Sequence, residues 1–334
     1  MKNVKVAIIG TGYIADYHAR GLQTIPGVEI ALSVDTQPEA AQKFADKYNI
    51  KEIATDAMSI LDRDDIDAVV LGIPNKFHAP YAIEFMRNKK DVFLEKPMAM
   101  NSIEGEELIK TINSTDQILM VGHMWRFDAE VNFIKNIVDS GRLGKIFKTK
   151  GYGIHENWGP SGWFTKKELA GGGALADMGV HAIDTVRYIL GDPKPVEVYA
   201  KIGTYFGDYD VDDSGIIIIT WENGTNSVVE SGWMHPHMDM PEAGTQLFGT
   251  EGYGSLFPTH LKFNVEEYPG TFNAPMPEKT EHCDQSIYSN QMAHFIECIR
   301  TRKQPVPGFT EGQTVLKIVD AAYLSSKEGR AVKL

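Results

Sequence analysis

A buried strand that runs directly into a glycine-rich turn near the N-terminus most constrains the fold. Val4–Ile9 is apolar apart from one lysine, as is typical of a parallel strand covered on both faces. The turn that follows, residues 10–15, reads Gly-Thr-Gly-Tyr-Ile-Ala and fits the pattern G-x-G-x-x-G/A. Its first glycine permits a tight turn, its second lets a pyrophosphate approach the backbone, and its small third residue lets helix and strand pack closely. The pattern predicts a dinucleotide site in which a helix N-terminus faces the phosphates.

An acidic residue at the end of the next strand indicates which dinucleotide binds. Val28–Val34 is a second apolar run, and it ends in Asp35, roughly 20 residues after the glycine-rich turn, as the dinucleotide motif requires. A carboxylate there can accept hydrogen bonds from the adenosine ribose and repels a 2′-phosphate, and Thr36 and Gln37 bring no compensating cation. The sequence therefore favours NAD over NADP. The competing interpretation is an aspartate that merely closes a strand in a non-binding domain.

Strand-like and helical patterns alternate through the first 122 residues. Strand patterns cover 67–73, 92–94 and 118–121, and helical patterns cover 40–48, 78–88 and 103–112. This alternation predicts an open parallel sheet with helices on both faces, and an NAD-binding Rossmann domain over residues 1–122. Ligands bind such sheets at the carboxyl ends of strands. The cofactor-binding residues that we expect are Gly10, Gly12, Tyr13, Ile14, Asp35, Pro74, Asn75, His78, Glu95 and Lys96.

Two of these residues have open alternatives. His78 either contacts the ligand or starts a helix with its ring satisfied by the backbone. Lys96 is either an inert surface lysine or a functional one. Pro97 restricts the backbone of Lys96 to extended conformations. Beside an oxidised nicotinamide, the Lys96 ammonium could orient a substrate hydroxyl and help its deprotonation.

A second glycine-rich stretch, residues 171–173, leads into a predicted helix that carries an Asp–His pair. At about 100° per residue, Asp177, His181 and Asp184 share one helix face. A carboxylate one turn from an imidazole can fix its tautomer, as a general base requires. The alternative is a helix with ordinary surface Asp and His side chains. The opposite face supplies a predicted core stripe of Val180, Ile183, Val186 and Leu190.

Beyond residue 122 the pattern changes to that of an α+β domain, which we expect to span 123–334. Strand patterns at 146–154, 196–202, 214–221, 225–233, 245–248 and 254–257 follow one another with few helices between them, and 223–224 is an Asn-Gly hairpin signal. They predict a large, mostly antiparallel sheet. Helical patterns cover 129–139, 289–301 and 310–326. Arg126, near the domain junction, contacts substrate or forms a structural ion pair.

Composition and charge limit the partners. The chain has 33 Lys plus Arg against 45 Asp plus Glu, a net charge of -12, which disfavours nucleic acid and anionic membranes. Cys283 and Cys298 lack metal-site spacing, and His235 and His237 have no third ligand nearby, so we expect no metal. The chain begins with a strand and its apolar runs are too short to cross a bilayer, which favours a cytoplasmic location.

These motifs together resemble the glucose–fructose oxidoreductase/inositol dehydrogenase/MocA (Gfo/Idh/MocA) family over essentially the whole chain. The resemblance rests on the first glycine-rich turn, on Ile-Pro-Asn at 73–75 followed by a histidine, on Glu-Lys-Pro at 95–97, and on the 171–173 glycines ahead of the Asp–His pair. It implies a Rossmann domain and a C-terminal sheet domain that often forms the interface of a homodimer or homotetramer. It also implies that Lys96, Asp177 and His181 are the catalytic set. His181 would be the acid/base, Asp177 would orient it, and Lys96 would bind the reacting hydroxyl.

The resemblance extends less closely to substrate residues. His-x-Asn at 155–157 and Asp184 look like positions that inositol dehydrogenases use. Where family members often have Trp-Arg ahead of the glycines, this chain has Trp163 and Phe164, so a role for that arginine is absent. The expected substrate-binding residues are Arg126, His155, Asn157, Trp163, Asp184 and Tyr288.

The function that these observations favour is NAD-dependent oxidation of a secondary hydroxyl of a sugar, inositol or other polyol, or glycoside to a ketone. Two other functions remain open. One is an NAD-dependent glycoside hydrolase that acts through a transient 3-keto sugar. The other is a non-catalytic regulator that senses NAD or a sugar.

Overall fold

The chain folds into two compact units. We describe a computed structural model that covers residues 3–236, 241–264, 270–273 and 284–334. The first unit comprises Met1–Met124 and Lys279–Gln313, and the second comprises Trp125–Glu278 and Thr314–Leu334. This division differs from the predicted one, because a helical segment from the C-terminal part of the chain packs with the first unit.

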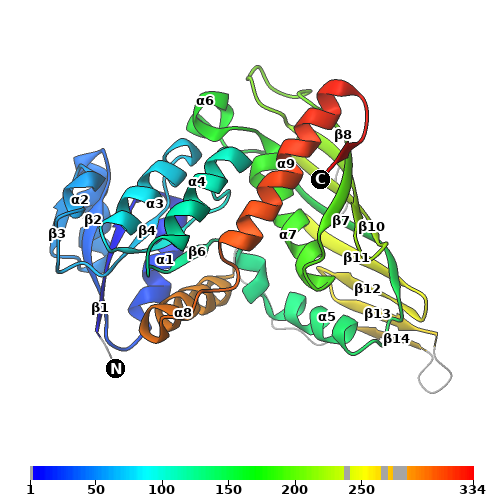
Figure 1. The fold of residues 1–334 in the computed structure, drawn as a ribbon, viewed down its shortest axis with the longest axis horizontal. Coiled ribbons are helices and arrows are strands. Elements are labelled where there is room, and N and C mark those ends of the chain that lie inside the picture. The colour runs from blue at the N-terminus through cyan, green and yellow to red at the C-terminus, as the bar shows by residue number, and fades with distance from the viewer. Residues whose placement is uncertain (1–2, 237–240, 265–269, 274–283) are drawn as a thin grey trace. The chain divides into compact units, whose positions relative to one another are not determined.

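The first unit is built on a six-stranded parallel sheet in the order β3-β2-β1-β4-β5-β6 (Figure 1). β4 and β5 are completely buried, as the apolar runs predict, because helices cover both faces of the sheet. The reversal of strand order beside β1 places the carboxyl ends of β1 and β4 at a ligand-binding edge. The strands are β1 (Val4–Ile9), β2 (Val28–Val34), β3 (Glu52–Ala54), β4 (Ala68–Leu71), β5 (Asp91–Leu94) and β6 (Leu119–Val121).

Helix α8 accounts for the difference between the predicted and the observed division. Its residues lie in the C-terminal part of the chain, yet it packs on α1 of the first unit. Gly21 of α1 permits this contact: a Cβ there would lie 3.2 Å from Cγ of Met292 and from the backbone of α8. Arg302, just after α8, pairs with Asp91 of β5 at 2.6 Å. The helices of this unit are α1 (Tyr13–Gln23), α2 (Pro38–Tyr48), α3 (His78–Arg87), α4 (Ser102–Asn113) and α8 (Gln285–Thr301), with short turns η1 (Ala57–Ile60) and η2 (Asn75–Phe77).

The second unit is built on a nine-stranded sheet in the order β14-β13-β12-β11-β7-β10-β9-β8-β15. All pairs are antiparallel except β7 with β10, so the predicted mostly antiparallel sheet is confirmed. The patterns missed only the short strands at its ends. The strands are β7 (Ile146–Glu156), β8 (Pro195–Gly203), β9 (Ser214–Trp221), β10 (Asn226–His235), β11 (Ala243–Gly249), β12 (Gly252–Leu256), β13 (His260–Phe263), β14 (Gly270–Asn273) and β15 (Val332–Lys333).

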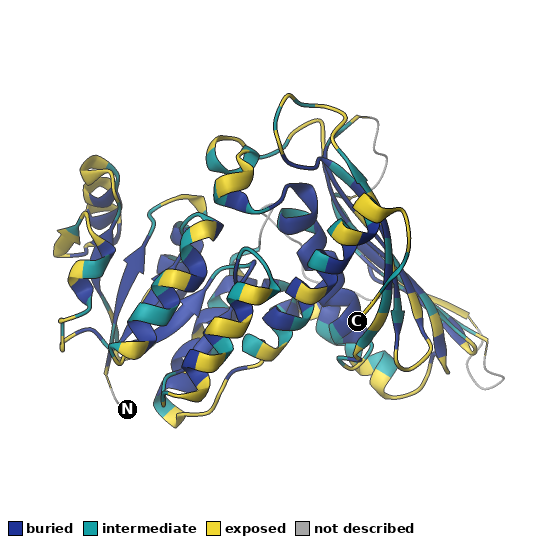
Figure 2. Ribbon diagram, turned by 45° about the horizontal axis from the view of Figure 1, so that its top comes forward, coloured by how far each residue is buried: buried dark blue, intermediate teal, exposed yellow. Residues whose placement is uncertain are grey.

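One face of this sheet carries the core of the second unit. Val180, Ile183 and Val186 of α7 are buried against strands β8 to β10, as the predicted stripe requires. Figure 2 colours buried residues dark blue and exposed residues yellow. Gly151 and Gly153 of β7 let this helix approach, since added Cβ atoms would lie 2.9 Å from Val186 and 2.8 Å from the Met178 carbonyl oxygen. The helical elements are α5 (Ala129–Asp139), α6 (Lys167–Ala170), α7 (Val180–Ile189) and α9 (Phe309–Glu328), with turns η3 (Met124–Phe127), η4 (Gly162–Thr165) and η5 (Leu175–Gly179).

The other face of the sheet carries exposed apolar side chains. Ile216 and Ile218 of β9 are 53% and 41% exposed, whereas their neighbours Ile217 and Ile219 are fully buried in the core. In the part of the chain that the structure describes, no helix is both long and apolar enough to cross a membrane.

Candidate functional site

The predicted dinucleotide turn lies between β1 and α1. Glycine is needed at its two glycine positions for different physical reasons. Gly10 has φ 84°, and a Cβ there would lie 2.2 Å from the Gly72 carbonyl oxygen, so the fold itself requires glycine. At Gly12 an added Cβ would meet no protein atom within 4 Å. Gly12 therefore leaves open space at the N-terminus of α1, beside the exposed Tyr13 and half-buried Ile14. This arrangement fits a pyrophosphate that approaches the helix N-terminus.

Asp35 ties this turn to the end of β2. One carboxylate oxygen accepts hydrogen bonds from the Thr11 amide at 3.0 Å and the Thr11 hydroxyl at 2.8 Å. The other accepts from the Gln37 amide at 3.0 Å. The carboxylate is thus held next to the glycine-rich turn.

The loops after β4 and β5 are joined by His78. Its Nδ1 lies 2.7 Å from the Pro97 carbonyl oxygen and its Nε2 lies 2.8 Å from the Ile73 carbonyl oxygen. Both ring nitrogens thus face backbone carbonyl oxygens. Of the two alternatives that the sequence left open for His78, this is the one in which the backbone satisfies the ring. The side chain is buried, like that of Asn75, whereas Pro74 is half-buried. His78 therefore fixes the two loops to each other.

Glu95 faces inward, and its partner was missed by sequence reasoning. Its Oε1 lies 2.8 Å from Nε2 of the fully buried His18, and its Oε2 accepts a hydrogen bond from the Lys96 amide at 3.2 Å. Burial alone would raise the pKa of Glu95, but the hydrogen bond and charge of His18, with the charge of Lys96, lower it below its ordinary value. The pair anchors the backbone that carries the half-buried Lys96.

In the second unit, the glycines before the Asp–His pair are required by tertiary contacts. A Cβ on Gly172 would lie 2.1 Å from the Tyr323 hydroxyl, and one on Gly173 would lie 1.8 Å from the Asp212 carbonyl oxygen. The Asp212 carboxylate accepts hydrogen bonds from the amides of Gly173 and Leu175, both at 2.8 Å, and from the Tyr323 hydroxyl at 2.6 Å. Asp212 therefore fixes the backbone that leads into the Asp–His segment, a role that no local pattern reveals.

The pair itself begins on a π turn rather than on a regular α-helix. Residues Leu175–Gly179 form the π turn η5, and α7 starts only at Val180. The angles predicted from a regular helix therefore do not apply to Asp177. Its Oδ2 accepts a hydrogen bond at 3.1 Å from the indole Nε1 of Trp233. His181 is 7% exposed, and its ring lies 5.2 Å from that of Trp125, centroid to centroid.

Arg126 and Asp184 form a buried ion pair. The guanidinium donates to both carboxylate oxygens of Asp184 at 2.7 and 2.8 Å, and to both of Asp192 at 2.7 and 3.0 Å. The structural ion pair that the sequence left open for Arg126 is therefore present, and it also holds Asp184. The substrate contacts predicted for Arg126 and Asp184 would therefore have to be made by two side chains that already bind each other.

The end of β7 carries the other predicted substrate residues. The His155 ring stacks on that of Trp158 at 3.6 Å and 26°, and its Nδ1 lies 3.4 Å from Oε2 of Glu242. The Trp158 indole donates a hydrogen bond to Glu242. Asn157 is exposed and has φ 52°. Trp163 stacks on its neighbour, Phe164, at 3.8 Å.

Tyr288 belongs to the first unit. It lies on α8, is 3% exposed, and its hydroxyl donates to Sδ of Met124 at 2.6 Å. Its ring lies 4.8 Å from that of Tyr17, centroid to centroid. These contacts are those of a side chain that packs α8 onto α1.

Comparison with known proteins identifies the family. Residues 4–123 match the model of an oxidoreductase family with an NAD-binding Rossmann fold, and residues 131–254 match the Gfo/Idh/MocA C-terminal domain. The chain belongs to the Gfo/Idh/MocA family. The predicted fold class, the NAD-binding first domain and the oxidoreductase class are therefore confirmed.

Relatives of this Gfo/Idh/MocA protein match along their whole length. It is 28% identical to a D-glucoside 3-dehydrogenase of Escherichia coli K12, over 99% of this chain and 97% of the relative. It is 27% identical to an NAD-dependent scyllo-inositol 2-dehydrogenase of Bacillus subtilis 168, over 99% and 96%. The fold matches that of levoglucosan dehydrogenase in complex with NADH and levoglucosan, with a TM-score of 0.91, 24% identity and 99% of each chain covered.

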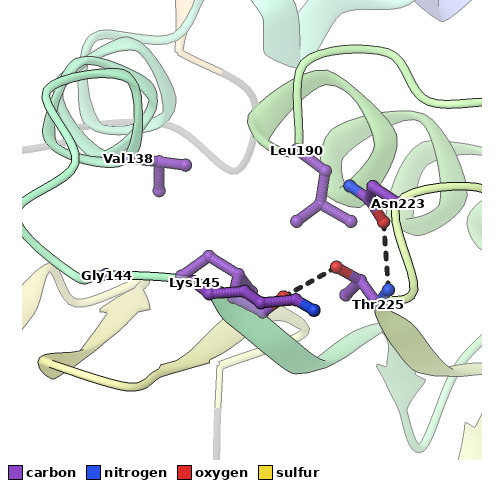
Figure 3. Close-up of a pocket in the computed structure, with 7 residues that line it drawn as sticks. Val138, Gly144, Lys145, Leu190, Asn223 and Thr225 are labelled. Atoms are coloured by element: carbon purple, nitrogen blue, oxygen red, sulfur yellow. Dashed lines mark hydrogen bonds between the residues drawn. The ribbon is translucent and has the colours of Figure 1, made fainter.

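The second unit of this family member also has a small pocket. A pocket of about 190 Å³ is lined by Val138, Gly144, Lys145, Ile146, Leu190, Asn223 and Thr225 (Figure 3). Its polar side chains bond locally, since Asn223 Oδ1 accepts from the Thr225 amide and the Thr225 hydroxyl donates to the Ile146 carbonyl. Within the described ranges, no three His, Cys, Asp or Glu side chains cluster as metal ligands would. His237 and Cys283 lie outside these ranges.

Proposed function

We propose that this protein is an NAD-dependent dehydrogenase that reversibly oxidises a secondary hydroxyl of a sugar, inositol, other polyol or glycoside to a ketone. The observation that carries the proposal is the Asp177–His181 pair, in which Trp233 holds Asp177 and Asp212 holds the preceding glycine, in a chain whose first unit has a dinucleotide turn. Two relatives that match the whole chain are named as a glucoside dehydrogenase and an inositol dehydrogenase, which supports this substrate class.

The residues of the first unit would bind the cofactor. The backbone at Gly12, Tyr13 and Ile14 would face the pyrophosphate, and the Asp35 carboxylate would accept hydrogen bonds from the adenosine ribose. The loops that His78 joins, which carry Pro74 and Glu95, would border the same strand ends. When bound, NAD supplies a hydride acceptor.

The catalytic residues would handle the proton and the oxygen. His181 takes the proton of the substrate hydroxyl, and it returns the proton when the ketone is reduced. Asp177 orients the imidazole and stabilises its charged form. The Lys96 ammonium binds the reacting oxygen and polarises it, which is the role that the family resemblance implies.

Substrate recognition is proposed for His155, Asn157 and Trp163, the positions that the sequence predicts. His155 lies on the same strand face as Gly153, which contacts η5. Arg126 and Asp184 would act by holding α7 in place, because their charged groups bind each other. The hydrolase alternative is not favoured, since both relatives described above are dehydrogenases.

The sheet of the second unit supports a further part of the proposal, a homodimer or homotetramer. Ile216 and Ile218 expose apolar side chains on the face opposite the core. Burying such a face between copies removes apolar surface from water. Light scattering of the purified protein, with Ile216→Lys as the matched variant, tests this: the wild type should be larger than one chain and the variant smaller than the wild type.

A panel of polyols, inositols and glycosides with NAD, followed by NADH absorbance, tests the reaction. We expect His181→Ala and Lys96→Ala to lose turnover on the active substrate while they retain NAD binding by calorimetry. Unchanged turnover in both variants would refute the site. Absence of an NADH signal over the whole panel would favour the non-catalytic regulator, and release of aglycone without net NADH would favour the hydrolase.

A further inference from the structure

Trp233 is a buried tryptophan whose polar end meets the proposed catalytic machinery. It lies near the end of β10, on the strand face that carries Val229 of the core, and it is 1% exposed. Its indole N–H donates to Oδ2 of Asp177 at 3.1 Å. A buried indole N–H needs an acceptor, and here the acceptor is the carboxylate that would orient His181 rather than a backbone carbonyl.

The surroundings of Trp233 fix the direction of this hydrogen bond. Its backbone amide donates to the Asp213 carbonyl at 2.8 Å. Gly159 approaches so closely that a Cβ there would lie 3.0 Å from the Trp233 Cβ. The Tyr209 ring meets the indole edge-on at 6.3 Å, and Ala174 and Val211 complete the cluster. A side chain held on several sides presents its N–H in one direction, which is what a positioning group requires.

We propose that Trp233 is a positioning residue for the reaction: its indole N–H holds the Asp177 carboxylate in the orientation that His181 needs. This inference rests on the proposed function. A hydrogen bond to a carboxylate is stronger than one between neutral groups, and it favours the ionised acceptor. Without it, Asp177 can turn away, and His181 then accepts the substrate proton less readily. The effect acts on turnover and not on binding of substrate or NAD.

Trp221 provides a matched control on the neighbouring strand β9. It is also 1% exposed, and its indole Nε1 donates to the Ser227 hydroxyl at 2.7 Å. Replacement of either tryptophan by phenylalanine deletes one buried indole hydrogen bond and preserves an aromatic ring. Of these two tryptophans, Trp233 donates to Asp177 and Trp221 donates to Ser227, so the two variants separate loss of stability from loss of positioning.

The experiment is a double-mutant cycle on the active substrate. We expect Trp233→Phe to lower kcat about tenfold or more, which corresponds to the loss of a hydrogen bond to a charged group, with KM and NAD affinity within about twofold of wild type. Trp221→Phe should leave kcat within about twofold. In an Asp177→Asn background, Trp233→Phe should change kcat by less than about twofold, because the two residues act through one contact.

The outcomes separate this inference from the proposed function. If Asp177→Asn and His181→Ala retain full turnover, the proposed function fails. If both lose turnover while Trp233→Phe behaves like Trp221→Phe, only the role of Trp233 is refuted. Multiplicative effects of Trp233→Phe and Asp177→Asn would also overturn it. Urea unfolding of each variant shows whether the two tryptophan substitutions cost comparable stability.

Discussion

Replacement of Arg126 by methionine should strongly destabilise the second unit. The Arg126 and Asp184 side chains are 2% and 3% exposed, and the guanidinium donates two hydrogen bonds to this carboxylate. Burial alone would lower the pKa of Arg126, but Asp184 and Asp192 outweigh burial and raise it. Arg126 is therefore charged at neutral pH, and Arg126→Met takes the guanidinium away from a buried carboxyl group.

The magnitude follows from the burial of the pair. Removal of one partner of a buried ion pair costs about 3–5 kcal/mol. The contacts to Asp192 add less, because that side chain is 30% exposed and water can solvate its carboxylate. For a unit of this size, each kcal/mol lowers the melting temperature by about 2–4 °C, so we expect a decrease of about 6–20 °C.

Urea unfolding and calorimetry measure this loss against two controls. Arg87→Met removes an exposed pair, in which Arg87 and Glu84 are 61% and 45% exposed, and should cost less than about 1 kcal/mol. Arg126→Met combined with Asp184→Leu should recover much of the loss, because it leaves no buried charge from this pair. An Arg126→Met protein within about 1 kcal/mol of wild type would refute the reasoning. A raised KM at unchanged stability would instead support the substrate contact that the family resemblance suggests.

Three further outcomes are expected. Gly12→Ala should leave the melting temperature nearly unchanged, because no protein atom lies within 4 Å of the added Cβ. It should weaken NAD binding, measured by calorimetry, about tenfold. An unaltered NAD affinity would contradict the assignment of this turn to dinucleotide binding. Burial raises the pKa of Cys298 to about 11. In a Cys283→Ser background, a thiol reagent at neutral pH should therefore label Cys298 only after unfolding. Rapid labelling of the folded protein would contradict the burial of Cys298. Because the pKa of Glu95 is lowered, its contribution to stability is present at neutral pH and is lost as the pH falls below the ordinary value of 4.5. His18→Leu should weaken this acid dependence of the free energy of unfolding, measured from neutral to acid pH. An unchanged pH profile would contradict the pairing of His18 with Glu95.

Much of the first unit could be predicted from sequence because its signals are local. An apolar run, a glycine-rich turn and an acidic strand end lie within one βαβ unit, so β1, α1 and β2 follow from neighbouring residues. The Asp–His pair and the Glu-Lys-Pro block were likewise found as short patterns. Short-range patterns report the preference for helix or strand and which face is apolar, and both depend only on neighbouring residues.

The contacts that hold the functional residues were decided by the tertiary structure. Sequence spacing placed Asp177 on a regular helix, whereas a π turn and the indole of Trp233 set its position. The glycines of the second glycine-rich stretch are required by Asp212 and Tyr323, which lie far along the chain. Helix α8 joins the first unit because its packing partner, α1, is distant in sequence. Local sequence determines which elements form and which residue types are available for chemistry. Which side chain holds a carboxylate or an imidazole in place depends on residues that only folding brings together, and the spacing of one motif carries no information about them.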